Sequence, residues 1–192
     1  YTVLQPIEKL VSPTLISGID SNDYYMMDNF MILHGDTPFF STRIKDKDEQ
    51  NDPDALMEVE VIYPGRYEPS DDVYYGALNT ISTLTGTSVV KLGYTEDDLK
   101  RYGLFEPAYT IGFKYKDEEI MLFFSEQQED GTYYALSSLF PDTISVCDGD
   151  TVSFLQADVL SWISPYVFRY YITAISEFSI RDSSGETVFT LS

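Results

Sequence analysis

The sequence YTEDDLKRYGLFEP, residues 94–107, contains the signals that begin and end one short helix. Thr95, followed three residues later by Asp98, resembles a capping box, in which each side chain binds the backbone N–H group of the other residue. Gly103 can adopt the left-handed backbone angles that close a Schellman turn, and Pro107 cannot continue a helix. The stretch therefore predicts a helix that begins after Thr95 and ends before Gly103.

The residues after this helix stop have the period of a β-strand. Four large apolar residues alternate with small or charged ones, which is the pattern of a strand with one buried face. The set expected to be buried is Tyr109, Ile111, Phe113 and Tyr115, and the set expected to face water is Thr110, Gly112, Lys114 and Lys116. Three further extended runs follow at residues 120–125, 132–138 and 143–147, separated by segments of hairpin length. Together these runs predict an antiparallel meander.

Two other segments have apolar residues at the spacing of an amphipathic helix. The first covers residues 71–86, where Ser70 is placed to cap the helix and Gly86 to end it. The second runs over residues 152–163 until Pro165 intervenes. We expect both segments to bury one face.

The two ends of the chain are extended in character. Strand-like runs occur at residues 24–35 and 56–64, and the acidic segment 45–54 between them is expected to be an exposed loop. A closing hairpin is predicted over residues 176–192, with residues 182–185 supplying the turn. Because runs of hairpins are interrupted by only a few helices, the predicted class is α+β: an antiparallel β-sheet meander with a few amphipathic helices packed on one face.

Composition limits the classes of partner. Twelve basic and thirty-two acidic residues give the 192-residue chain a net charge of −20. A nucleic-acid backbone would be repelled, because its binding requires Lys and Arg to displace counterions. No apolar run reaches the roughly eighteen residues that suggest a membrane span. The chain begins at Tyr1 without Met or a charged leader, so we expect a precursor with a further N-terminal segment such as an anchor.

In their order along the chain, these segments resemble domain-of-unknown-function family 4340. The most specific matches are DLKRYGLFEP (98–107) before a strand, GTYYAL (131–136) in the third strand of the meander, and TISVC followed by VSFL (143–155). The segment at residues 59–84, in which a strand leads through a polar turn into a helix, is also similar. One departure is that no glycine ends the second hairpin strand before Gly131.

The resemblance spans roughly residues 58–182, and it divides the chain into three parts. Residues 1–57 supply N-terminal strands and the acidic loop of the same domain, 58–182 form the family-like core, and 183–192 end the closing hairpin. Because family members often contain successive copies of the unit, the resemblance implies that 183–192 are the possible start of a further repeat.

The resemblance to this family implies a cellular context but no particular reaction. Such proteins are bacterial, membrane-anchored, extracytoplasmic components found with ABC-type transporter systems related to gliding-motility proteins. We therefore expect a non-enzymatic extracytoplasmic binding or scaffold domain of the cell envelope, with protein partners such as ABC transporter subunits. The resemblance assigns no catalytic residue, no cofactor and no metal ligand.

Two alternatives from other classes remain open. The first is an enzyme that acts on glycans through carboxylates, which are too abundant here to be paired by spacing alone. The second is a calcium-stabilised adhesion module, because alternating aspartates in the acidic loop are spaced like oxygen ligands of a calcium loop. They are Asp46, Asp48, Asp52 and Asp54. Asn51 stands where the calcium loop requires glycine, which favours a solvated loop.

Three further features have both a structural and a functional interpretation. His34 lies beside Gly35 and is expected to be an ordinary turn residue, since no second histidine completes a zinc site. Cys147, the only cysteine, is expected to be a small buried hydrophobic residue, and it excludes an internal disulfide. The aromatic cluster at residues 162–171 is either part of the core or an interface. Its members are Trp162, Tyr166, Phe168, Tyr170 and Tyr171.

Overall fold

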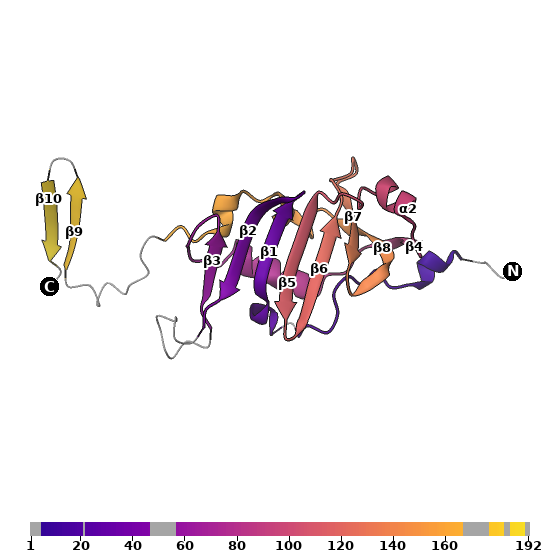
Figure 1. The fold of residues 1–192 in the computed structure, drawn as a ribbon, viewed down its shortest axis with the longest axis horizontal. Helices are drawn as coiled ribbons and strands as arrows, with labels where there is room; N and C mark the ends of the chain where they lie inside the picture. The colour runs from indigo at the N-terminus through magenta and orange to yellow at the C-terminus, as the bar shows by residue number, and fades with distance from the viewer. Residues whose placement is uncertain (1–4, 21, 47–56, 167–176, 183–184, 191–192) are drawn as a thin grey trace.

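Eight strands form one antiparallel sheet in the order β3-β2-β1-β5-β6-β7-β8-β4 (Figure 1). The computed structural model describes residues 5–20, 22–46, 57–166, 177–182 and 185–190. The strands are β1 (Asp28–His34), β2 (Thr37–Ile44), β3 (Val59–Tyr63), β4 (Ser88–Leu92), β5 (Tyr109–Tyr115), β6 (Glu118–Phe124), β7 (Thr132–Ser137) and β8 (Phe140–Asp148). The described protein is mostly β, so the predicted α+β class holds only in its coarse outline.

The predicted meander is confirmed as β5-β6-β7-β8, in which each strand pairs with the next. The N-terminal hairpin of β1 and β2 joins this meander because β1 pairs antiparallel with β5. The strands at the two edges are β3 and β4. On the outer edge of β3, Val61 and Tyr67 exchange two backbone hydrogen bonds of 2.9 and 3.3 Å. The turn that carries Tyr67 therefore covers the edge of the sheet at Val61.

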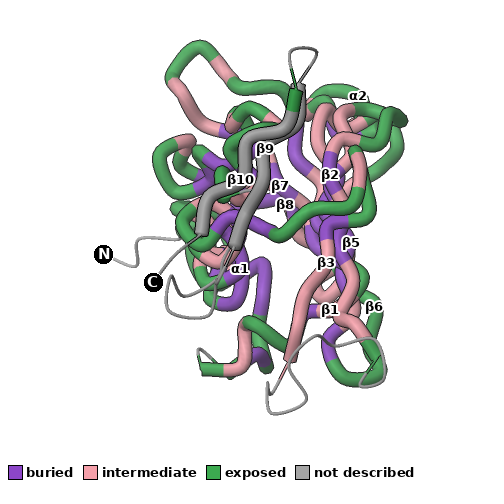
Figure 2. Tube along the Cα trace, turned by 90° about the vertical axis from the view of Figure 1, so that its left-hand side faces the viewer, coloured by how far each residue is buried: buried purple, intermediate pink, exposed green. Residues whose placement is uncertain are grey.

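Helix α1 (Val73–Ser82) lies against one face of the sheet and buries Tyr74, Ala77, Leu78 and Ile81 (Figure 2, left of the strands). The N-cap position is Asp72, which makes no side-chain cap, but the hydroxyl of Ser70, the predicted cap, accepts a hydrogen bond from the Val73 N–H group at 3.3 Å. The predicted end at Gly86 is wrong. The helix ends at Ser82, and Gly86 lies against β8, where a Cβ atom would be 2.5 Å from the Val146 carbonyl oxygen.

Helix α2 (Glu96–Arg101) has both predicted ends. Thr95 and Asp98 form the capping box, each side chain accepting a hydrogen bond from the other backbone N–H group. At the other end, Leu104 donates to the Leu99 carbonyl at 2.8 Å and Gly103 has a φ of 66°. This is the Schellman arrangement, which turns the chain toward β5.

The other helices within the described residues are short 3-10 turns: η1 (Ile7–Leu10), η2 (Tyr24–Met26), η3 (Ser153–Gln156) and η4 (Val159–Trp162). The helix predicted over residues 152–163 is therefore wrong, because two such turns replace it. Ala157 and Asp158 between them are extended, and the Asp158 carboxylate accepts a hydrogen bond from the Leu160 N–H group at 2.8 Å. Asp158 thus starts a new turn where the pattern predicted a continuous helix.

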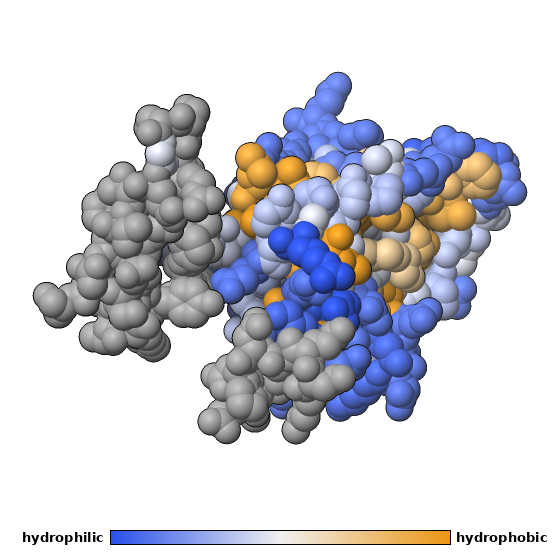
Figure 3. All heavy atoms as spheres, turned by 60° about the vertical axis from the view of Figure 1, so that its left-hand side comes forward, coloured by the Kyte–Doolittle hydropathy of each residue, from blue (hydrophilic) through white to orange (hydrophobic). Residues whose placement is uncertain are grey.

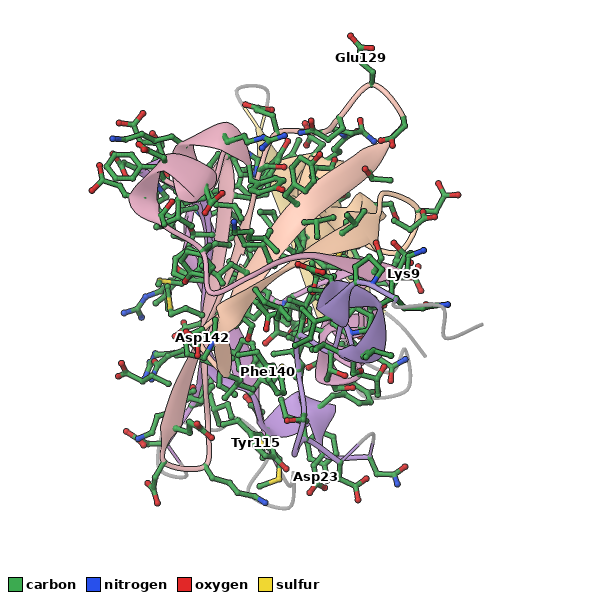
Figure 4. The ribbon with its side chains drawn as sticks, turned by 90° about the vertical axis from the view of Figure 1, so that its right-hand side faces the viewer. Lys9, Asp23, Tyr115, Glu129, Phe140 and Asp142 are labelled. Atoms are coloured by element: carbon green, nitrogen blue, oxygen red, sulfur yellow. The ribbon has the colours of Figure 1, made fainter. Side chains whose placement is uncertain are left out.

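The core lies between the sheet and α1, where the buried backbone is coloured purple in Figure 2. On β5, Ile111, Phe113 and Tyr115 are buried as predicted, and Tyr109 is partly buried. The Tyr115 hydroxyl donates to the Asp23 carboxylate at 3.5 Å, and both residues lie at the same end of the molecule in Figure 4. This hydrogen bond links the end of β5 to the segment that precedes β1.

The predicted C-terminal hairpin is confirmed as β9 (Glu177–Asp182) and β10 (Gly185–Thr190). The two strands pair only with each other and form a separate two-stranded sheet. The hairpin therefore closes neither edge of the eight-stranded sheet.

Candidate protein-binding face

The face of the sheet opposite α1 carries large apolar side chains at its centre. Five of them are partly exposed and lie outside the core cluster: Met31, Leu33, Met121, Phe123 and Leu136. We call these five residues the methionine face. The open face of an antiparallel sheet is usually polar, so this apolar surface is a feature that packing of the core does not explain.

Strand register makes the methionine face continuous. In one cross-strand row, Met31 lies opposite Gly112, which lies opposite Met121. In the next row, Leu33, Thr110, Phe123 and Leu136 follow one another across β1, β5, β6 and β7. Because opposite residues on neighbouring strands contact each other, the two rows form one surface over four strands.

Gly112 brings the two methionines together. A Cβ atom at this position would lie 2.7 Å from Met31 Cε and 2.8 Å from Met121 Sδ. The two thioether side chains therefore occupy the space above the glycine. The prediction that Thr110 and Gly112 face water is wrong, because neighbouring side chains on the open face bury both of them. Methionine is flexible and polarizable, which suits a surface that adapts to its partner.

Charged residues and tyrosines border this apolar centre. Arg43 and Glu60 form an ion pair of 3.0 Å between β2 and β3. At the end of the sheet near the β5–β6 turn, Lys114 lies opposite Glu119. At the other end, the rings of Tyr134 and Tyr102 pack edge to face, with their centres 4.8 Å apart. An apolar centre with a polar rim is the usual organisation of a protein–protein interface.

Figure 3 shows part of this face on its right, where orange hydrophobic residues lie between blue polar ones. Figure 2 views the sheet along its edge, with α1 on one side only. Helix α2 buries none of its residues and lies at the end of the sheet. Among the described residues, no helix covers the centre of the methionine face, so the predicted packing of several helices reduces to α1 and the 3-10 turns.

Sequence reasoning missed the methionine face, although a signal was present. The runs FMIL (30–33) and IMLFF (120–124) are apolar at every position. In a strand, such a run places apolar residues on both faces instead of one. Reading these runs as strands with two apolar faces would have identified Met31, Leu33, Met121 and Phe123.

The predicted aromatic cluster does not form one interface. Trp162 is fully buried and packs against Phe30 and Phe40, with ring centres 6.2 and 5.0 Å away, so its interpretation as core is confirmed. Tyr166 is 63% exposed. Phe168, Tyr170 and Tyr171 lie outside the described residues.

The calcium hypothesis falls mostly outside the described chain. Asp46 is exposed, and Asp48, Asp52 and Asp54 lie in the segment 47–56, which the structure does not describe. Within the described ranges, no three His, Cys, Asp or Glu side chains gather as metal ligands would. The calcium loop therefore stays a prediction.

The described carboxylates with resolved pKa shifts serve a helix cap and a turn. Hydrogen bonds with Thr95 lower the pKa of Asp98, and hydrogen bonds with Thr132 lower the pKa of Asp130. A glycosidase acid requires a raised pKa, so neither residue suits that role.

Cys147 is buried as predicted. Burial, with a smaller contribution from Asp148, raises the pKa of its thiol to about 12. A thiol with this pKa stays protonated at neutral pH and is not a nucleophile.

His34 is more constrained than the turn residue we predicted. It is the last residue of β1, and its ring stacks on Phe39 with ring centres 4.0 Å apart. The Tyr109 ring packs edge to face against the imidazole, with ring centres 5.0 Å apart. Burial lowers the pKa of His34, so the imidazole is neutral at pH 7.

No family model, curated protein or solved structure matches this chain. Among the described residues, no helix has the length and apolar character needed to cross a membrane. The resemblance to family 4340 therefore stays a prediction, and functional inference depends on the geometry described above.

Proposed function

We propose that this chain is a non-enzymatic binding module that holds a protein partner on the methionine face. The observation that supports this role is the pair of continuous apolar rows across β1, β5, β6 and β7 on the side of the sheet opposite α1. Surfaces that are apolar at the centre and charged at the rim commonly mark sites of protein association.

The partner that fits this face is an apolar segment flanked by basic residues. The chain carries a net charge of −20, so it attracts a cationic protein over long distances and repels an acidic one. Leu33, Phe123 and Leu136 offer aliphatic and aromatic contact area beside the two methionines. A partner with leucine-like side chains between lysines or arginines would match both properties.

The resemblance to family 4340 supplies the biological setting of this proposal. We place the module on the extracytoplasmic side of a bacterial envelope, in a membrane-anchored protein, with subunits of an ABC-type transport system as partners. The carboxylate-based glycan enzyme and the calcium-stabilised adhesion module remain alternatives, but no described geometry favours either one.

Binding of a designed peptide tests the proposed face. The probe is an amphipathic peptide of leucine and lysine, compared with a peptide in which glutamate replaces every lysine. The variants are Met121→Gln and Phe123→Gln, and the control is Leu160→Gln, which changes a leucine that is 73% exposed and outside the methionine face. We expect each face variant to weaken binding of the lysine peptide about fivefold to tenfold, and the control to leave it unchanged.

Calorimetry gives the affinities, and circular dichroism checks that every variant is folded. The glutamate peptide should bind at least about tenfold more weakly than the lysine peptide at low salt. Equal affinity of the wild type and both face variants for the lysine peptide would refute the proposed binding face.

A further inference from the structure

The two methionines of the methionine face lie side by side at its centre. Met31 on β1 and Met121 on β6 are both opposite Gly112 of β5 in one cross-strand row. A Cβ atom on Gly112 would lie 2.7 Å from Met31 Cε and 2.8 Å from Met121 Sδ, so the two side chains share the space above the glycine. Leu33 and Phe123 follow two residues later on the same strands, and therefore on the same face. A chemical change at either sulfur atom thus takes place in the middle of the apolar surface.

Small solutes can reach both of these side chains. Met31 and Met121 are partly exposed, whereas Met27, in the core on the other side of the sheet, is 0% exposed. Hydrogen peroxide is a small uncharged molecule, so the net charge of −20 does not repel it. The two thioethers at the centre of the face are therefore open to oxidation, which the core methionine resists.

No reactive thiolate of this chain competes with these thioethers for an oxidant. Cys147 on β8 is the only cysteine of the sequence, and it is buried. Burial raises the pKa of its thiol to about 12, so the sulfur stays protonated at neutral pH. Peroxides attack thiolates, and a buried protonated thiol is inert. The exposed methionines are therefore the sulfur atoms that a peroxide meets first.

We propose that Met31 and Met121 are a modification site, at which oxidation by a peroxide prevents the methionine face from binding its partner. The sulfur of each thioether donates an electron pair to one oxygen of hydrogen peroxide, so that an S–O bond forms and the O–O bond breaks. The transferred oxygen gives its proton to the departing hydroxide, which leaves as water. This two-electron oxidation leaves a methionine sulfoxide. A sulfoxide reductase restores the thioether by oxidising two thiols to a disulfide and releasing water.

The sulfoxide affects binding and leaves the fold intact. Its oxygen is a strong hydrogen-bond acceptor, which needs a donor when it is buried. In the free protein both side chains are partly exposed, so water supplies that donor. Under an apolar partner the oxygen loses this water, and the neighbouring side chains of Leu33 and Phe123 offer no donor in return. This inference rests on the proposed function, because it requires a partner that covers the face.

Peptide binding before and after oxidation tests the proposed switch. The folded chain is treated with hydrogen peroxide, catalase removes the excess, and calorimetry measures the affinity for the leucine and lysine peptide. This peptide contains no sulfur, so oxidation changes only the protein. We expect the oxidised protein to bind at least about tenfold more weakly. Mass spectrometry should find sulfoxide at Met31 and Met121 but not at the buried Met27. Methionine sulfoxide reductases with dithiothreitol should restore the affinity.

Two double variants separate the face from the other methionines. Met31→Leu with Met121→Leu keeps the face apolar and removes both thioethers from it, so peroxide should change its affinity by less than about twofold. Met26→Leu with Met57→Leu is the matched control, because it removes two accessible methionines outside the face. The control should show the same loss of affinity on oxidation as the wild type. Circular dichroism checks that each protein is folded before and after treatment.

The outcomes distinguish this inference from the proposed function. If the reduced wild type does not bind the peptide, the proposed function fails and the switch fails with it. If the reduced protein binds and the fully oxidised protein binds equally well, the switch alone is refuted. The switch is also refuted if Met31 and Met121 stay unoxidised while Met26 is oxidised. A loss of binding that persists in Met31→Leu with Met121→Leu, or that accompanies unfolding, would show that oxidation acts elsewhere in the chain.

Discussion

Two glycines in this chain have opposite effects on stability at the scale of single residues. Gly103 has a φ of 66° at the end of α2, whereas Gly76 lies inside α1 with no atom within 4 Å of the position of a Cβ atom. We predict that Gly103→Ala lowers the free energy of unfolding by about 1 kcal/mol, because a side chain disfavours left-handed backbone angles. We predict that Gly76→Ala raises it by roughly 0.5 to 1 kcal/mol, because alanine favours the helix.

Urea-induced unfolding followed by circular dichroism measures both changes. The two variants serve as controls for each other, since each adds one methyl group. A Cβ atom at position 103 would lie 3.4 Å from the Ser125 Cβ atom, which is ordinary contact, so the loss should come from the backbone. Stabilisation by Gly103→Ala would contradict the Schellman turn described here.

His34 should make stability depend on pH in the mildly acidic range. Burial lowers its pKa below the ordinary value of 6.5, so between the two pKa values the unfolded chain binds more protons than the folded one. Stability from this group is therefore complete above pH 6.5 and is lost as the pH falls toward the folded pKa. We predict that the wild type loses more stability between about pH 7.5 and 5.5 than His34→Gln does. A parallel pH dependence of the two proteins in urea titrations would show that His34 is not the group responsible.

Cys147 should be chemically inert while the chain is folded. Its thiol has a pKa raised to about 12 by burial, so almost no thiolate exists at about pH 8. We predict that a thiol reagent such as dithionitrobenzoate reacts slowly with native protein and completely within minutes in denaturant. Rapid reaction of the native protein would mean that the β8 strand exposes this side chain.

At the scale of elements, the start of α2 depends on one threonine. Thr95→Ala removes the hydroxyl that accepts a hydrogen bond from the Asp98 N–H group at 3.3 Å and donates to its carboxylate at 2.9 Å. We predict a loss of about 1 kcal/mol in the free energy of unfolding. The pKa of Asp98 should rise part of the way toward its ordinary value, because the variant keeps the backbone hydrogen bond from Thr95, the main cause of the lowered pKa, and loses the hydroxyl, the second cause.

Chemical denaturation and an NMR titration of the Asp98 carboxyl give the two readouts. Thr151→Ala, at an exposed position in the turn after β8, is the control and should change neither of them. If the Asp98 pKa is the same in wild type and Thr95→Ala, the capping box does not form in solution.

Elements were predictable where local chemistry decides them. The capping box, Gly103 and Pro107 determine α2 within a dozen residues, and strict alternation determines the buried side of β5. The segment 152–163 was not predictable in this way, because apolar spacing alone does not separate one helix from two 3-10 turns around an extended Asp158. The prediction that Gly86 ends α1 failed for a related reason. Gly86 allows close contact with the Val146 carbonyl, which lies sixty positions later in the chain.

At the scale of the whole molecule, excess negative charge should affect stability. A net charge of −20 on 192 residues produces repulsion in the folded state that salt screens. We predict that the melting temperature rises when sodium chloride increases from about 20 to about 300 mM. Calorimetric melting curves test this, with an uncharged osmolyte at equal osmolality as the control. A melting temperature that falls or stays constant with salt would show that attractive ion pairs such as Arg43–Glu60 outweigh the repulsion.

The order of the strands in the whole sheet could not be predicted from the sequence. The pairing of β1 with β5 and of β4 with β8 joins segments more than fifty residues apart, and no local pattern specifies such partners. The candidate binding face depends on such pairings, because the methionine face needs β1 beside β5.

The turn that covers β3 also limits how copies of this chain can assemble. Open sheets grow into filaments when the outer strand of one molecule adds to the outer strand of the next, which requires a free border at each end. Here the backbone N–H and C=O groups of Val61, on the outer edge of β3, are already hydrogen-bonded to Tyr67. Head-to-tail polymerisation through these borders would have to displace that turn first, so crowding of many copies at high concentration should not seed fibres by this route.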